Sequence, residues 1–133
     1  MRKFIKWLIT ICYFLFLTYV SIKGGTSSQE VSQLRQAAHN ACHVPAYAIL
    51  TYLLVWSFAS LRRDVLIKVF FISFSYGILM EILQSFSPNR LPSLSDVGLN
   101  AIGTGVMIWL LKNRYLKIYE FNMVDRLKMG QKT

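Results

Sequence analysis

Four long apolar runs, separated by charged or polar segments, are the feature that most restricts how this chain can fold. They extend over Phe4–Ile22, Pro45–Leu61, Val65–Leu83 and Ser95–Leu111. A helix needs roughly 20 largely apolar residues, within a range of about 17–25, to cross the hydrocarbon core of a bilayer. Each run falls in that range. We therefore expect an all-α membrane protein, a bundle of four transmembrane helices forming one domain over residues 1–133.

Composition supports this interpretation and argues against a nucleic-acid partner. Hydrophobic residues make up 54% of the chain, above the roughly 45–50% of a soluble domain. The net charge of +9 would suggest nucleic acid in a soluble protein. Here the basic residues lie at the chain ends and between the apolar runs, where they orient a membrane protein. Cys12 and Cys42 fall at different predicted depths, so we expect no disulfide between them.

The distribution of Lys and Arg predicts the orientation in the cell membrane. With four spans, twelve basic residues fall on the side of the termini: Arg2, Lys3, Lys6, Arg62, Arg63, Lys68, Lys112, Arg114, Lys117, Arg126, Lys128 and Lys132. The opposite side holds three, Lys23, Arg35 and Arg90. Because basic residues favour the cytoplasmic side, both termini are predicted to be cytoplasmic. The first run resembles a secretory signal, but it is long and lacks a good cleavage site, so we expect it to remain as a span.

Sequence signals at the ends of the runs predict further helical features. Ser27 and Glu30 form a capping-box pattern before a short helix over 29–38, expected at the outer surface. The tail after Leu111 alternates aromatic, apolar and basic residues, which predicts a basic C-terminal helix on the inner leaflet. Ser95 is the expected N-cap of the fourth helix, with Asp96 at its positive end.

Polar residues, with glycines among them, recur at helical spacing within three of the runs. They are His43, Tyr47 and Thr51 on the second, Ser73, Gly77, Glu81 and Gln84 on the third, and Asp96, Asn100 and Gly103 on the fourth. His39 continues the second stripe, but Pro45 favours the first turn of a helix, which would assign His39 to the preceding segment. Gly103 and Gly105 would allow a neighbouring helix to approach closely.

The predicted topology brings the ends of these stripes to one depth, on the extracytoplasmic side. Singly, each residue has a structural explanation: Glu81 and Arg90 could form an ion pair, and Asn100 could make an interhelical hydrogen bond worth about 0.6 kcal/mol. Together, an acid, a histidine and a cation at one depth favour a pocket. The candidate ligand-binding residues are His43, Tyr47, Glu81, Gln84, Arg90, Asp96 and Asn100.

The segment from Tyr76 to Gly103 resembles the VanZ-like family. It contains Tyr76-Gly77, Glu81, Gln84, Phe86, Pro88, Arg90, Ser93, Asp96, Asn100 and Gly103 at the spacing of that family's signature, Y-G-x-x-x-E-x-x-Q, then F and P, R, S-x-x-D, N and G. His43 and Tyr47 resemble its earlier H-x-x-x-Y pattern. Family members commonly carry an acidic–basic pair, D-K, before that histidine, where this chain has His39-Asn40. If that pair contributes to ligand binding in the family, this protein is expected to differ in what it binds.

The resemblance implies a small four-helix membrane protein linked to the cell envelope or to glycopeptide tolerance, because the family is named for a protein associated with teicoplanin resistance. One hypothesis is a binding protein for membrane lipids, a lipid-linked envelope precursor or a lipoglycopeptide, with Arg90 pairing to phosphate or carboxylate.

The alternative is an enzyme acting on an envelope lipid, with Glu81, His43 and Asp96 as candidate catalytic residues in acid–base chemistry. The third hypothesis is a transporter or an assembly partner. The spacing of the histidine and the acids matches no metal signature, so we expect no metal and no cofactor.

Overall fold

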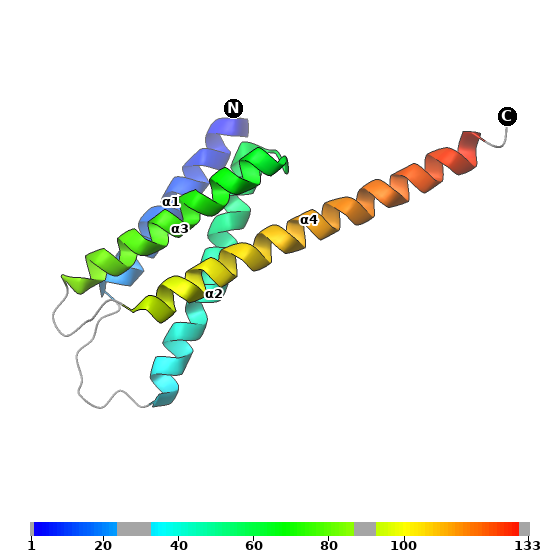
Figure 1. The fold of residues 1–133 in the computed structure, drawn as a ribbon. Helices are drawn as coiled ribbons and strands as arrows, with labels where there is room; N and C mark the ends of the chain where they lie inside the picture. The colour runs from blue at the N-terminus through cyan, green and yellow to red at the C-terminus, as the bar shows by residue number, and fades with distance from the viewer. Residues whose placement is uncertain (1, 24–32, 87–92, 131–133) are drawn as a thin grey trace.

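Four helices account for nearly all of the residues that the computed structural model describes, which are 2–23, 33–86 and 93–130. They are α1 (Arg2–Lys23), α2 (Gln33–Phe58), α3 (Arg63–Ser85) and α4 (Leu94–Gly130) (Figure 1). Within these ranges there is no strand. Each helix contains a stretch long and apolar enough to cross a membrane. The predicted all-α membrane bundle with four spans is therefore confirmed.

Two helices are longer than the apolar runs that predicted them. α2 begins at Gln33 and passes through Pro45 without interruption, so the expectation that Pro45 lies in the first turn is wrong. The short helix predicted at 29–38 is helical from Gln33 and continuous with α2, while residues 29–32 lie outside the described part of the chain. The helix predicted in the tail is likewise the continuation of α4 as far as Gly130.

The core lies around α2, which packs against each of the other three helices. Leu50 and Leu54 of α2 and Val69 of α3 are fully buried at its centre. Large apolar side chains also point outward on every helix, among them Phe4, Phe71 and Trp109. Water would penalise so much exposed apolar surface, whereas the hydrocarbon of a bilayer solvates it. The outward-facing residues are therefore the lipid-facing surface of the bundle.

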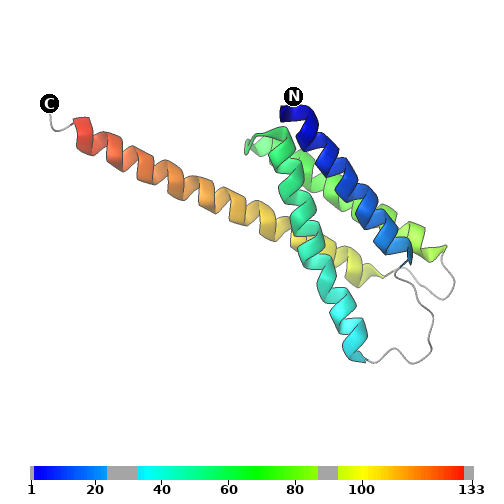
Figure 2. The same ribbon diagram turned by 180° about the vertical axis from the view of Figure 1, so that it is seen from behind.

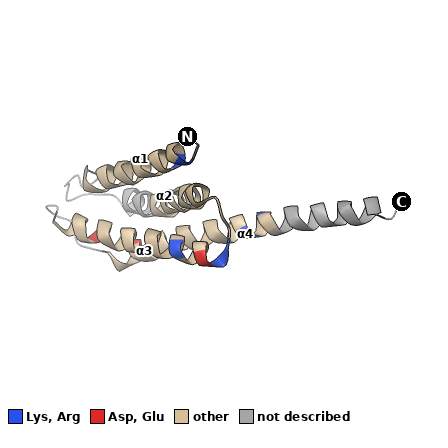
Figure 3. Ribbon diagram, turned by 90° about the horizontal axis from the view of Figure 1, so that it is seen from above, with Lys and Arg blue, Asp and Glu red and all other residues tan. Residues whose placement is uncertain are grey.

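The bundle has two ends that differ in charge. At one end α2 passes into α3 and α1 begins; we call this the α2–α3 end (Figures 1 and 2). At the other, the α3–α4 end, α3 finishes and α4 begins. The described Lys and Arg residues gather toward the α2–α3 end and on the part of α4 beyond the bundle (Figure 3). The orientation of the two ends across the membrane stays the prediction made from the sequence.

Hydroxyl groups join the helices in the interior. Thr10 Oγ1 lies 2.8 Å from Ser57 Oγ, which joins α1 to α2. The hydroxyl of Tyr76 donates to the Phe14 carbonyl at 2.7 Å and also pairs with Thr18 Oγ1 at 2.9 Å, which joins α3 to α1. Such bonds hold helices together in a bilayer because the hydrophobic effect does not drive one apolar helix toward another there.

Candidate functional site

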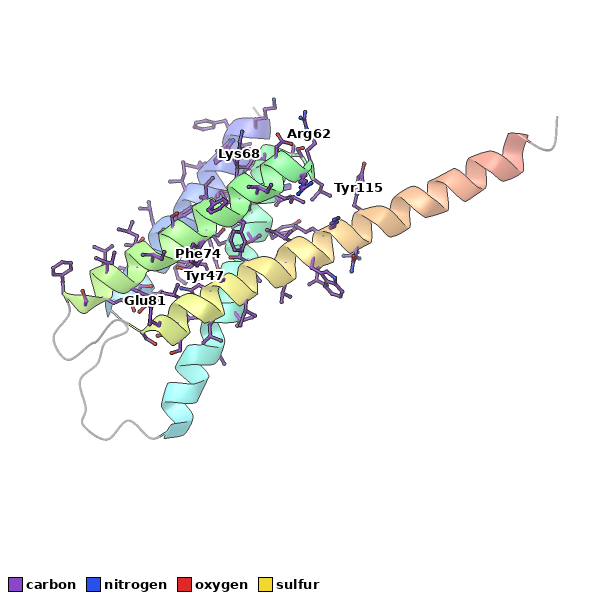
Figure 4. All side chains as sticks on the ribbon, in the orientation of Figure 1. Tyr47, Arg62, Lys68, Phe74, Glu81 and Tyr115 are labelled. Carbon is purple, nitrogen blue, oxygen red and sulfur yellow. The ribbon has the colours of Figure 1, made fainter. Side chains whose placement is uncertain are left out.

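The sequence-predicted polar residues of α2, α3 and α4 meet at the α3–α4 end. We call the group formed by His43, Glu81, Ser93, Asp96 and Asn100 the polar cluster. Glu81, Asp96 and Asn100 are almost completely buried, with 4%, 8% and 1% of their surface exposed. Figure 4 shows Glu81 near the end of α3, close to the beginning of α4. Two carboxylates buried together are costly in any protein, and ionisable residues within transmembrane helices are rare and commonly mark functional sites.

His43 connects α2 to α4. Its Nδ1 lies 2.9 Å from Asn100 Oδ1, and because an amide oxygen can only accept, Nδ1 carries the proton in this pair. The other ring nitrogen, Nε2, lies 4.0 Å from Asp96 Oδ2, which is beyond hydrogen-bond distance. The imidazole is thus oriented by an amide on one side and faces a carboxylate on the other.

Glu81 fixes the beginning of α4 through Ser93. Glu81 Oε2 accepts the backbone N–H of Ser93 at 3.0 Å, and Ser93 Oγ accepts the backbone N–H of Asp96 at 3.3 Å. Ser93 is therefore the N-cap, and the expectation that Ser95 caps this helix is wrong; Ser95 lies inside α4, with its hydroxyl 2.6 Å from that of Ser93.

This cap leaves the carboxylate of Asp96 available. In a capping box the acidic side chain three residues after the cap accepts the N–H of the cap residue. Here Glu81, which comes from another helix, accepts that N–H in place of Asp96. The Asp96 carboxylate consequently faces His43 and the interior of the cluster instead of closing the first turn of its own helix.

Three buried side-chain atoms of the cluster lack a hydrogen-bond partner among the described residues. They are Glu81 Oε1, Asp96 Oδ1 and Asn100 Nδ2. Each such atom costs about 1–3 kcal/mol, and a charged group costs more. The cluster thus combines a fixed scaffold of hydrogen bonds with two unused acceptors and one unused donor.

Close helix packing positions Asn100 against its neighbours. A Cβ on Gly77 would lie 3.1 Å from Asn100 Nδ2 and 3.4 Å from Tyr47 Cε1, so the lack of a side chain there makes room for both. A Cβ on Gly103 would meet the backbone of Val44, with the carbonyl carbon and Cα each 3.1 Å away. The predicted close approach at Gly103 is confirmed, whereas that at Gly105 is wrong, because nothing lies within 4 Å of the corresponding position.

The remaining predicted residues lie around the cluster or outside the described chain. Tyr47 and Gln84 are buried, with 4% and 3% of their surface exposed. Arg90 lies outside the described residues, and so does its expected pairing with Glu81. Within 2–23, 33–86 and 93–130, no group of three or more potential metal ligands comes together.

Sequence analysis did not select Ser93 or Thr104 as site residues. Ser93 acts through its backbone N–H, which Glu81 accepts, and through its hydroxyl, which caps α4; the S-x-x-D spacing of Ser93 and Asp96 was the available signal for the cap. Thr104 is fully buried, and its hydroxyl has no partner among the described residues. It follows Asp96 and Asn100 at a spacing of four, which was the available signal for placing it on the same face of the helix.

The fold and the cluster define a class: a four-helix membrane protein that holds buried, incompletely paired acidic and amide groups at one end of its bundle. A protein-family model described as VanZ/LLP1 matches residues 4–117, which is most of the chain. The chain therefore belongs to the VanZ/LLP1 family, as its motifs had predicted. Neither a search of curated proteins nor a search of solved structures gave a match.

Proposed function

We propose that the polar cluster binds the polar group of an envelope lipid or a lipid-linked wall precursor, and that this binding contributes to cell-envelope or teicoplanin tolerance. The observation that carries the proposal is the set of unpartnered buried atoms, Glu81 Oε1, Asp96 Oδ1 and Asn100 Nδ2. A ligand that supplied their partners would recover about 1–3 kcal/mol for each hydrogen bond. In a purely structural cluster, the desolvation of these atoms would remain uncompensated.

The chemistry of these atoms selects the kind of ligand. An ionised carboxylate only accepts hydrogen bonds, so Glu81 and Asp96 favour a ligand with hydroxyl, amide or ammonium donors. The N–H of Asn100 Nδ2 favours a carbonyl or phosphate oxygen on the same ligand. Sugar-bearing and peptide-bearing lipid headgroups offer both kinds of group. Glu81 lies four residues before the end of one candidate span and Asp96 two residues after the beginning of the next, so we expect the cluster to be within reach of lipid headgroups.

Arg90 completes the proposal from outside the described residues. It is three positions before Ser93 in the connection that joins α3 to α4. A guanidinium can pair with phosphate through two parallel hydrogen bonds, which an ammonium cannot do. Arg90→Lys is therefore expected to reduce binding and tolerance while the protein stays at its normal level in the membrane. Full tolerance in this variant would reduce the role of Arg90 to a generic positive charge.

The test compares two aspartates in the same protein. Asp96→Asn keeps the size of a buried side chain in the cluster, and Asp64→Asn makes the same change at the exposed α2–α3 end, where Asp64 pairs with Arg62. Purified protein in phosphatidylcholine nanodiscs would be titrated with a polyprenyl-linked disaccharide-peptide wall precursor. A hydrogen bond to a charged group is worth about 1.5–3 kcal/mol, so Asp96→Asn should weaken binding tenfold or more. Asp64→Asn should leave it unchanged.

The same variants can be compared in cells. The teicoplanin tolerance of an expressing host is measured, and immunoblots of its membranes give the amount of protein. Asp96→Asn and Glu81→Gln should lose tolerance at normal abundance; the amide oxygen of Gln can still accept the Ser93 N–H, so the helix cap is retained. Equal precursor binding and equal tolerance in Asp96→Asn and Asp64→Asn would overturn the proposal.

A second candidate function, acid–base catalysis on such a lipid, is favoured by the geometry of His43. An imidazole oriented by Asn100 at 2.9 Å and facing Asp96 at 4.0 Å resembles an oriented general base. Incubation of the nanodisc preparation with the same precursor, followed by mass spectrometry, separates the two functions. Product formation that is abolished in His43→Gln supports an enzyme, and an unchanged precursor that remains bound supports a binding protein.

A further inference from the structure

A second candidate site lies at the opposite end of the bundle. A pocket of about 640 Å³ opens at the α2–α3 end, a volume within the range of small-molecule sites. It is bordered by the end of α2, the beginning of α1 and the middle of α4, and its lining includes Lys6, Tyr52, Trp56, Arg62, Leu111 and Tyr115. Figure 4 shows Arg62 and Tyr115 at this end, far from Glu81.

The charged side chains that line this pocket are basic, and Asp64, which pairs with Arg62, lies outside the lining. Lys6 and Arg62 line it, and none of the described lining residues is acidic. Lys6 Nζ donates one hydrogen bond to the Trp56 carbonyl at 3.1 Å and lies 5.0 Å from the centre of the Trp56 ring. These contacts hold the ammonium at the wall of the pocket. Arg62 uses its Nε to pair with Asp64 at 3.1 Å, and its guanidinium is otherwise largely exposed.

The position of the pocket along the membrane normal also constrains its ligand. The candidate spans end at Phe58 on α2 and at Tyr115 on α4, and one begins at Arg63 on α3. The pocket therefore lies near the ends of three candidate spans, where lipid headgroups are expected. Tyr52, Trp56 and Tyr115 are the aromatic types that concentrate at this interface. Val55 and Leu111 supply an apolar wall along which an acyl chain can lie.

We propose that this pocket binds the phosphate headgroup of an anionic phospholipid, with Lys6 and Arg62 pairing to the phosphate and the aromatic and aliphatic wall contacting the upper acyl chain. Charge complementarity selects an anion, and the combination of a cationic rim with an apolar wall at headgroup depth selects a lipid. The site is independent of the polar cluster, because it shares no residue with it and lies at the other end of the bundle.

The experiment measures retained lipid by native mass spectrometry of the full-length protein, reconstituted in vesicles of equal phosphatidylglycerol and phosphatidylcholine and then released into neutral detergent. Wild type should retain phosphatidylglycerol in preference to phosphatidylcholine. A basic residue near an anionic headgroup is worth about 1 kcal/mol, so Lys6→Gln and Arg62→Gln should each lower that preference about fivefold. Arg63→Gln is the matched control, because Arg63 is the exposed neighbour of Arg62 and does not line the pocket.

Each outcome decides the proposal. A loss in Arg62→Gln with less than a twofold change in Arg63→Gln supports it, even if Lys6→Gln lowers the yield of folded protein. Equal losses in all three variants would show a generic surface charge and overturn it, as would a wild type without lipid preference. A separate experiment adds inorganic phosphate to the protein with its bound lipid. Displacement of the lipid by millimolar phosphate would overturn the assignment to a lipid, and persistence of the lipid would support it.

Discussion

Gly103→Ala should destabilise the bundle, although alanine is the better helix former. The added Cβ would lie 3.1 Å from both Cα and the carbonyl carbon of Val44, and nearer still to the carbonyl oxygen. Backbone atoms cannot rotate away as the end of a flexible side chain can, so α2 and α4 must separate. Overpacking of this kind costs about 1–3 kcal/mol. The gain in helix propensity of up to about 1 kcal/mol only partly offsets it.

Gly105→Ala is the matched control for this change. Gly105 lies in the same turn of α4, and nothing is within 4 Å of where its Cβ would be. Both variants gain the same propensity, so the difference in their free energies of unfolding isolates the clash at about 1–3 kcal/mol. Thermal unfolding of the two proteins in one detergent, followed by circular dichroism, measures it. If Gly103→Ala unfolds at the same temperature as Gly105→Ala, the close α2–α4 contact is wrong.

Three further predictions concern topology, interhelical bonds and the cap. Reporter fusions at Thr133 and beside Ser28 should report opposite sides of the membrane, with Thr133 cytoplasmic; an externally active reporter at Thr133 contradicts the charge argument. Tyr76→Phe loses two hydrogen bonds and should lower the free energy of unfolding by about 1 kcal/mol, while Tyr52→Phe, on an exposed face, should not. Ser93→Ala should cost about 1 kcal/mol of stability and Ser93→Asn, which can still cap the helix without adding a charge, almost nothing, which denaturant unfolding in detergent would reveal.

Hydropathy was sufficient to predict the four spans because the bilayer imposes length and apolar composition directly. The expectation that Pro45 lies in the first turn of its helix was wrong because that preference of proline describes helices in water. In a bilayer, ending the helix at Pro45 would leave several backbone groups unpaired, whereas continuing through it sacrifices one hydrogen bond. The helix therefore continues to Gln33, well before the apolar run begins.

Helical spacing placed His43, Glu81 and Asp96 at a common end but could not predict their partners. The contact between His43 and Asn100 depends on how closely α2 and α4 cross, which the backbone of Val44 and the bare Gly103 determine. The bond from Glu81 to the Ser93 N–H depends on the path of the chain between α3 and α4. Such tertiary contacts have no periodic pattern in the sequence. Binding by these residues stays a prediction.

The uninterrupted course of α4 joins the polar cluster to a helical arm outside the bundle. One uninterrupted helix carries Asn100 in the polar cluster, Gly103 at the crossing with α2, and Gly130 at its far end. At 1.5 Å per residue, the arm from Gly103 to Gly130 is about 40 Å long, so a tilt of about 5° at the crossing moves its tip by about 3.5 Å. If α4 tilts as one body about this crossing, a small displacement of Asn100 is accompanied by a movement of several ångströms at the far end of the helix.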